Sequence, residues 1–113
     1  MIAQYACASL VSQNKQLCTP ASVDTIDSSN GQEDHVSMGA NAATKLYRVV
    51  ANVQNIIGIE MLSAAQAIEF RRPLKSSPQN EALILAYRKH ISFIDEDRVI
   101  SKDMNKSTQF LFN

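Results

Sequence analysis

The most constraining feature of this sequence is a long proline-free stretch, residues 35–71, in which apolar side chains recur at helical spacing. Apolar residues, single or in adjacent pairs, recur every three or four residues, which places them along one face of an α-helix. The recurring positions are Ala42, Ala43, Leu46, Val49, Val50, Val53, Ile56, Ile57, Met61, Ala64, Ala65 and Ile68. Pro73 follows, and proline cannot continue a helix. The pattern predicts one helix over residues 35–71, on the order of 50 Å long.

The second half of this predicted helix, from residue 56 onward, is apolar on all sides. A helix that is apolar all round is normally buried all round. A chain of 113 residues cannot surround such a rod by itself. Aromatic residues make up only 6% of the chain and tryptophan is absent, so aliphatic side chains would form close contacts between helices. We therefore expect an all-α, long-helix bundle to which other copies or further segments of chain contribute.

The rest of the chain is predicted to form shorter helices and loops within one domain, residues 1–113. Residues 1–15 carry an apolar stripe at helical spacing and predict a helix. Residues 16–34 contain Pro20 and the pair Asn30-Gly31 and predict a loop, without strands because the flanks of the pair do not alternate. Ser77 followed by Pro78 is typical of a helix N-terminus, so C-terminal helices are expected within residues 78–113.

Charge and composition exclude several classes of protein. Eleven Lys and Arg balance eleven Asp and Glu without a basic tract, so no nucleic-acid partner is expected. The most apolar run, residues 56–67, is interrupted by polar side chains and is too short to cross a membrane. The N-terminus shows no signal-peptide pattern. Cys7 and Cys18 lack the neighbours of a zinc site, so we expect free thiols, no metal and a cytoplasmic protein.

Polar groups capable of acid–base chemistry are concentrated at residues 32–35, Gln-Glu-Asp-His, just before the long helix. In one interpretation Glu33 or Asp34 caps that helix and favours its positive end. A divalent metal site would need a further ligand at a defined spacing, and none is apparent. In a third interpretation one of Glu33, Asp34 and His35 points into a substrate site and moves protons there. The residue types alone leave these alternatives open.

Other candidate groups fit ordinary structural roles better. His90 lies near a predicted helix C-terminus, where cations are favourable, and Arg71-Arg72 end the long helix in the same way. The serines have no Gly-x-Ser-x-Gly context, which argues against a serine hydrolase.

The order of residues resembles the aromatic amino-acid ammonia-lyase family, in particular the C-terminal part of its histidine-specific members. The most specific match is residues 32–39, Gln-Glu-Asp-His-Val-Ser-Met-Gly. Shorter matches lie at residues 1–6, 8, 10–12, 20–24, 52–53, 60, 64–67, 72–75, 93 and 96–98. The resemblance spans essentially the whole chain. It implies the C-terminal part of the family's helical fold, with residues 16–34 as an active-site loop.

The resemblance also implies roles for Glu33 and Gln32. In the family, the position matching Glu33 contributes to the substrate pocket, and it is Glu in histidine-specific members but usually Gln in phenylalanine and tyrosine lyases. A carboxylate can accept hydrogen bonds from an imidazole N–H or an ammonium group, whereas a phenyl ring offers it no donor. The implied reaction converts L-histidine to urocanate and ammonia, with Glu33 as catalytic and substrate-binding residue and Gln32 as substrate-binding residue.

The family's electrophile does not come from this chain. It is a methylidene-imidazolone formed autocatalytically from Ala-Ser-Gly, and no Ala-Ser-Gly occurs here. We therefore expect no cofactor in this chain, and no activity from the chain alone. Two smaller departures from the family pattern are Gly31, where Asn is common, and Gln13, where Glu is common.

The resemblance also implies that several chains assemble. Members of the family are homotetramers with a shared core of long helices, so a homo-oligomer is expected, in agreement with the all-round apolar helix. Two alternatives remain: a non-catalytic helical oligomerisation fragment, or part of another aromatic amino-acid lyase or aminomutase.

Overall fold

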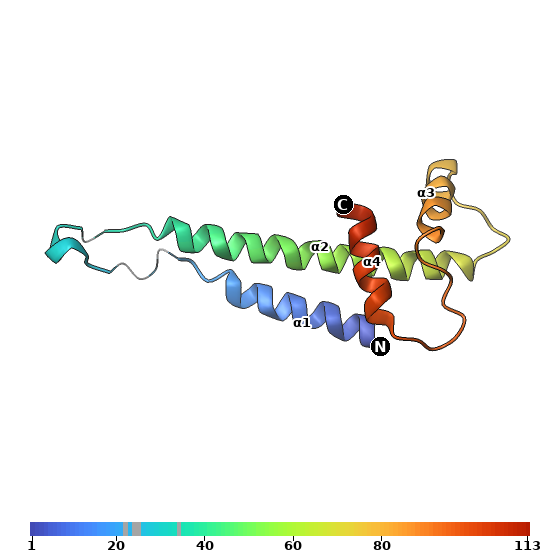
Figure 1. Cartoon of the computed structure of the whole chain (residues 1–113), viewed down its shortest axis with the longest axis horizontal. Coiled ribbons are helices and arrows are strands. Elements are labelled where there is room, and N and C mark those ends of the chain that lie inside the picture. The colour runs from blue at the N-terminus through green and yellow to red at the C-terminus, as the bar shows by residue number, and fades with distance from the viewer. Residues whose placement is uncertain (22, 24–25, 34) are drawn as a thin grey trace. The chain divides into compact units, whose positions relative to one another are not determined.

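The chain is built from helices joined by irregular segments. The computed structural model describes residues 1–21, 23, 26–33 and 35–113. These residues form α1 (Ile2–Leu17), the single turn η1 (Ser29–Gly31), α2 (Gly39–Glu69), α3 (Pro78–Arg88) and α4 (Ile100–Phe112) (Figure 1). Within the described ranges there is no β-strand, only one isolated antiparallel bridge between Ser28 and Glu33. The all-α prediction is confirmed.

The predicted bounds of the long helix were too wide at both ends. Helix α2 begins at Gly39 rather than at residue 35, because Met38 has φ 48°, a left-handed value that a right-handed helix cannot include. It ends at Glu69 rather than at residue 71. After Glu69, Arg71 N and Arg72 N donate to the carbonyls three residues earlier, Ile68 O and Glu69 O, which makes turns tighter than those of an α-helix. Helix α1 runs to Leu17, so the loop begins later than predicted.

The chain divides into two compact units, and the division falls inside both α1 and α2. We call Ala8–Val53 the hairpin unit and Met1–Cys7 with Gln54–Asn113 the core unit. No described helix has the combination of length and apolar character that a membrane span requires.

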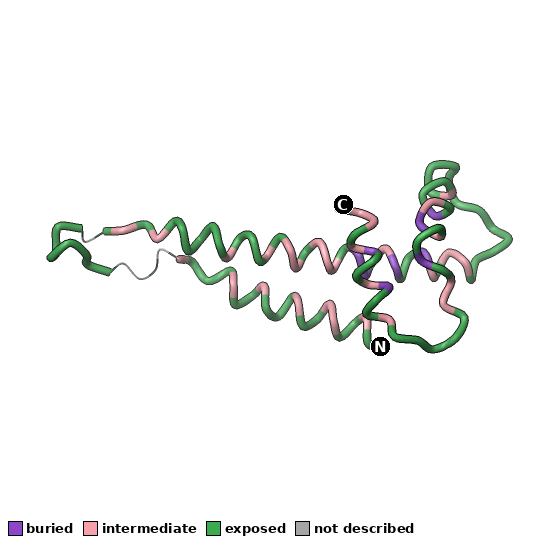
Figure 2. Tube along the Cα trace, in the orientation of Figure 1, coloured by how far each residue is buried: buried purple, intermediate pink, exposed green. Residues whose placement is uncertain are grey.

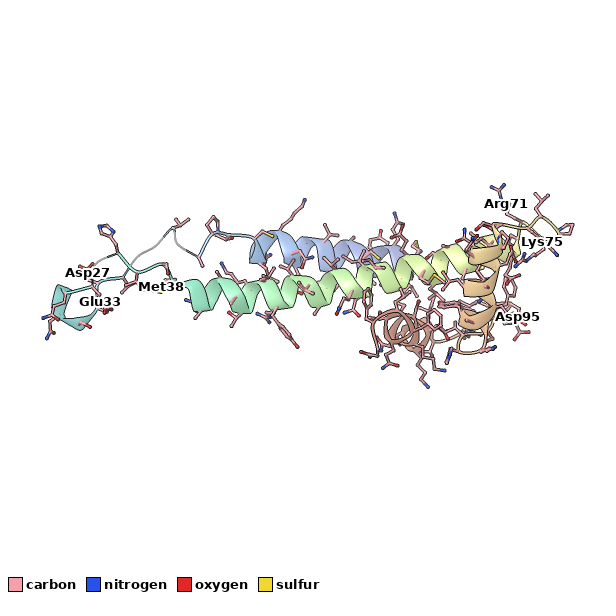
Figure 3. All side chains as sticks on the ribbon, turned by 90° about the horizontal axis from the view of Figure 1, so that it is seen from above. Asp27, Glu33, Met38, Arg71, Lys75 and Asp95 are labelled. Carbon is pink, nitrogen blue, oxygen red and sulfur yellow. The ribbon has the colours of Figure 1, made fainter. Side chains whose placement is uncertain are left out.

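In the hairpin unit, residues 8–17 of α1 lie antiparallel to residues 39–53 of α2 (Figures 1 and 3). Asn52 Nδ2 donates to Gln13 Oε1 at 2.7 Å and to Asn14 Oδ1 at 2.8 Å. Lys45 Nζ donates to the Thr19 carbonyl at 2.6 Å, which ties the end of α1 to α2. None of the described residues of this unit is buried (Figure 2). Polar contacts between the two helices therefore accompany a packing interface that stays partly open to solvent.

The core unit buries an apolar cluster between α2, α3 and the segment that follows α3. The buried members are Leu62, Ala65, Tyr87 and Ile91. Partly buried side chains pack around them, namely Met61, Ile94, Ile100, Met104 and Phe110. The ring of Phe110 meets that of Tyr87 edge-on at a centroid distance of 5.3 Å, which brings α4 into the cluster.

Helix α4 crosses α2 at Gly58, where a side chain would not fit. A Cβ atom added to Gly58 would lie 2.8 Å from the Thr108 backbone nitrogen. The close approach lets the buried Ser107 hydroxyl donate to the Gly58 carbonyl at 2.6 Å, while the Tyr87 hydroxyl donates to Ser107 Oγ at 3.0 Å. Burial raises the pKa of the Tyr87 phenol above its ordinary value.

Helix α3 starts as the sequence predicts. The Ser77 side chain accepts a hydrogen bond from Asn80 N at 3.3 Å, and Pro78 is its first residue. Glu81 accepts from Ser76 N and pairs with Arg72 at 2.8 Å, and these two contacts lower the pKa of the Glu81 carboxyl. The helix ends at Arg88, whose guanidinium pairs with Glu69 at 3.2 Å and donates to a carbonyl of α2.

Apolar side chains of α2 remain exposed in this single chain. Ile59, Leu62 and Ala65 are buried, as the all-round apolar pattern predicts. In contrast, large apolar residues on the same helix are 40% exposed or more, namely Leu46, Tyr47, Val50, Val53 and Ile57. One chain thus covers only part of its longest helix.

Candidate functional site

The candidate site lies in the connection between α1 and α2, inside the hairpin unit. Figure 3 labels Glu33 in this connection, together with Asp27 and Met38. A closed turn holds Glu33 in place. Ser28 N donates to the Glu33 carbonyl at 2.8 Å, and Glu33 N donates to the Ser28 carbonyl at 3.3 Å. The two residues therefore face each other across the turn as a single bridge.

The backbone inside this turn is left-handed at three successive residues. Ser29, Asn30 and Gly31 have φ values of 53°, 56° and 80°. Glycine adopts such values freely and asparagine tolerates them, whereas serine does so rarely. Non-glycine residues keep this conformation only where the surrounding structure imposes it, and such positions concentrate at functional sites. The Asn-Gly pair thus forms the turn expected of it, although no hairpin strands flank it.

The Glu33 carboxylate is held by a side chain as well as by its backbone. Ser28 Oγ donates to Glu33 Oε2 at 3.2 Å. The Glu33 side chain is exposed, and its other lone pairs accept no hydrogen bond from the described residues. A carboxylate can accept several hydrogen bonds, so this one retains room for donors on a ligand.

Ser28 was not singled out by the sequence analysis. The available signal was its place two residues before the Asn-Gly pair, since Glu33 lies two residues after it and positions equally distant from such a pair face each other across a turn.

The other predicted site residues make fewer contacts. Gln32 is exposed, and its backbone N–H donates to the Ser29 carbonyl at 3.3 Å. His35 is exposed, and Asp34 lies outside the described residues. The structure therefore joins Glu33 to Ser28 rather than to the Gln32 side chain.

The helix-cap interpretation of Glu33 is wrong. Helix α2 begins only at Gly39, and its first bonds run from Asn41 N and Ala42 N to the Met38 carbonyl. Glu33 is too far along the chain from these groups to satisfy the free N–H groups of the first turn. The Asp34 part of that hypothesis falls outside the described residues.

A surface hollow lies beside the same connection. It is lined by Thr19, Pro20, Ala21, Val23, Ile26, Met38, Asn41, Thr44 and Lys45. Val23 and Ile26 are 70% and 64% exposed, so the described chain leaves this apolar surface uncovered. Neither Glu33 nor Gln32 is among these lining residues.

The remaining candidates have structural surroundings. The His90 ring lies tilted by 50° against the ring of Phe110, with 5.6 Å between the centroids. Arg72 is paired with both Glu69 and Glu81 rather than free for an anion. Among the residues that the structure describes, no three His, Cys, Asp or Glu side chains gather as a metal site would require.

Comparisons with known proteins agree with the predicted resemblance. The sequence profile of the aromatic amino acid lyase family matches residues 1–89. The histidine ammonia-lyase of Symbiobacterium thermophilum is 48% identical over 113 residues, 100% of this chain, and that of Bacillus subtilis is 49% identical over 111 residues. The chain spans 22% of the length of each of these relatives.

Solved structures show the same similarity. The crystal structure of histidine ammonia-lyase from Trypanosoma cruzi matches 98% of this chain, and 22% of that one, with a TM-score of 0.94 and 46% identity. The ergothioneine-degrading enzyme ergothionase from Treponema denticola matches 92% of this chain, and 21% of that one, with a TM-score of 0.84 and 34% identity. The resemblance read from residues 32–39 and the shorter matches is confirmed, and the chain belongs to the aromatic amino acid lyase family.

Proposed function

We propose that this chain is the C-terminal part of an enzyme that eliminates ammonia from L-histidine to give urocanate. The observation that carries this proposal is the similarity to histidine ammonia-lyases along 98–100% of the chain at 43–49% identity. The Glu at position 33 supports the choice of histidine within the family. We further propose that the enzyme acts in the cytoplasm, a reducing compartment in which Cys7 and Cys18 would stay free thiols.

Glu33 is the residue of this chain that we assign to the reaction, with Gln32 beside it in substrate binding. The exposed carboxylate accepts a hydrogen bond from an N–H of the substrate's imidazole or ammonium group, and a charged acceptor makes such a bond stronger than a neutral one. A phenyl side chain would leave the same carboxylate desolvated without a partner, which is costly. Glu33 therefore favours histidine over phenylalanine.

The family's methylidene-imidazolone group does not fit the residues of this chain, because the chain contains no Ala-Ser-Gly from which it forms. Further segments of protein must supply the electrophile and the rest of the pocket. The 113-residue chain alone is expected to be inactive.

The exposed apolar residues of α2 support a role in assembly. Leu46, Val50, Val53 and Ile57 follow one another at spacings of three and four residues and are at least 40% exposed. We infer that copies of the full protein cover this face in a homo-oligomer, as the family resemblance implies.

The test is a chimera in which residues 1–113 replace the matching segment of the Symbiobacterium histidine ammonia-lyase, which aligns with the whole chain. Light scattering first establishes that the chimera assembles. Urocanate absorbance then measures turnover of L-histidine, which we expect in the chimera and not in the isolated chain. An assembled chimera without turnover would overturn the proposed function, and turnover by the isolated chain would overturn the dependence on other segments.

A Glu33→Gln variant of the chimera tests the assigned residue. We expect kcat/KM for histidine to fall roughly thirty-fold or more, as when a charged hydrogen-bond partner is lost. Turnover of phenylalanine, where measurable, should fall much less. Glu60→Gln is the matched control, because Glu60 is exposed on α2 and forms no ion pair with the described residues. Equal losses in both variants would remove Glu33 from the site.

Two alternatives have distinct signatures. Structural similarity to ergothionase suggests a different substrate, so ergothioneine is assayed beside histidine, and a preference for it would replace the histidine assignment. A non-catalytic oligomerisation fragment would give a stable oligomer of the isolated chain together with an inactive chimera.

A further inference from the structure

We propose that Ser28 is a positioning residue that holds the Glu33 carboxylate in its binding orientation. The inference rests on the proposed function of Glu33 and adds to it a second residue that does not itself touch substrate. Its basis is the hydrogen bond from Ser28 Oγ to Glu33 Oε2 at 3.2 Å, which closes the same turn as the backbone bridge.

Three hydrogen bonds connect these two residues directly. Besides the side-chain bond, Ser28 N donates to Glu33 O at 2.8 Å and Glu33 N donates to Ser28 O at 3.3 Å. Because both backbones are bonded to each other, the hydroxyl and the carboxylate start from fixed points on the same turn. The side-chain bond then restricts the rotation of a carboxylate that is otherwise exposed to solvent.

The backbone conformation of residues 29–31, between Ser28 and Glu33, supports a specific role for their contact. Ser29 takes a left-handed φ of 53°, which serine adopts rarely and keeps only under constraint, and Asn30 follows at 56°, which asparagine tolerates. Gly31, at φ 80°, completes the reversal without a steric penalty. The turn therefore keeps a conformation that is unfavourable for Ser29 while it presents Ser28 to Glu33.

In this geometry the two oxygens of the Glu33 carboxylate have different hydrogen-bond partners. Oε2 already accepts a hydrogen bond from the Ser28 hydroxyl, so Oε1, which accepts none from the described residues, has more room for a substrate N–H. The bond restricts the rotation of the Glu33 carboxylate before substrate binds, so less conformational entropy is lost on binding. Supporting residues improve binding and catalysis in this way. Ser28 thus acts through Glu33.

The experiment uses the chimera with four changes: Ser28→Ala, Ser28→Thr, Ser29→Ala and Ser28→Ala combined with Glu33→Gln. Ser28→Ala removes the donor, and Ser28→Thr keeps a hydroxyl. Ser29→Ala is the matched control, because it makes the same substitution at the next residue, whose side chain forms no hydrogen bond with the described residues. Light scattering and thermal unfolding verify that each variant assembles.

We expect kcat/KM for histidine to fall about ten-fold in Ser28→Ala, the size expected for one hydrogen bond to a charged group. Ser28→Thr and Ser29→Ala should stay within about two-fold of the parent. In the Glu33→Gln background, Ser28→Ala should cause almost no further loss, because the group it positions has already changed.

Different results would overturn the positioning role of Ser28 and the proposed lyase function. Equal losses in Ser28→Ala and Ser29→Ala, or an undiminished Ser28→Ala loss in the Glu33→Gln background, would overturn the positioning role and leave the lyase activity standing. An assembled parent chimera without histidine turnover would overturn both.

Discussion

The core unit and the hairpin unit share α2 yet differ in how they are stabilised. In the core unit, α2 contributes Ile59, Leu62 and Ala65 to a buried interior. In the hairpin unit no described residue is buried, and the contacts include exposed and half-buried polar bonds such as those of Asn52. Burial of apolar side chains is the main source of folding free energy. We therefore expect the core unit to carry most of the stability of the isolated chain, while the hairpin unit, which bears the candidate site, contributes little buried apolar surface of its own.

The largest expected effect is a difference in the free energy of unfolding between two Leu→Ala substitutions, one in the core unit and one in the hairpin unit. Leu62→Ala should lower the free energy of unfolding of the isolated chain by about 3 kcal/mol, because it leaves a cavity beside Tyr87 and Ile91. Leu46→Ala, at a side chain that is 62% exposed, should change it by less than about 0.5 kcal/mol. Urea unfolding followed by circular dichroism measures both, and equal losses would contradict the division into a buried and an open unit. In the assembled chimera, Leu46→Ala should become costly if other chains cover it.

The second prediction concerns the helix crossing. Gly58→Ala should destabilise the chain by about 2 kcal/mol, because the new methyl group would overlap the Thr108 backbone and force α4 away from α2. Gly39→Ala is the control, since its Cβ would meet only Ser37 Oγ at 3.7 Å, an ordinary contact. Thermal unfolding of the two variants compares them directly. A Gly58→Ala chain as stable as the parent would show that the crossing can relax.

A third prediction uses the buried phenol. Tyr87→Phe should cost about 1 kcal/mol at neutral pH through loss of the hydrogen bond to Ser107. The folded state raises the pKa of Tyr87 above 10.0, so at higher pH the unfolded chain releases this proton more readily. The stability that the protonated Tyr87 phenol contributes is fully present below about pH 10 and is lost as the pH rises through the pKa of Tyr87 in the folded state. Denaturation measured from pH 8 to 11 should therefore show a shallower decline in Tyr87→Phe than in the parent, and parallel declines would contradict the assignment.

The smallest expected effect lies in the hairpin unit. Asn52→Ala removes two amide bonds to α1 but should cost only about 0.5 kcal/mol, because these groups are exposed or half-buried and water can replace the lost bonds. Asn55→Ala, at the next turn of α2, removes an amide without a recorded bond to the described residues and serves as control. A loss of several kcal/mol in Asn52→Ala would mean that the hairpin unit is held far more firmly than its burial indicates.

Local sequence signals predicted much of this fold. The spacing of apolar residues located the long helix, and Ser77 with Pro78 located the start of α3, because caps and periodicity act within one or two turns. The predicted start of α2 was wrong because the left-handed Met38 has no strong sequence signature. The resemblance pointed to Glu33, but its partner Ser28 escaped notice because the two meet through a turn rather than through helical spacing.

The sequence by itself determined the helical architecture, the family and the acidic character of position 33, since each depends on residue type and local order. Only the tertiary structure decided which side chains pack against Leu62 and Ala65 of α2, where α4 crosses it at Gly58, and that the Ser28 hydroxyl bonds the Glu33 carboxylate. These features depend on atoms far apart in the chain, or on backbone angles that several residue types can adopt. Periodicity constrains which side of a helix is apolar, whereas packing decides what that side touches.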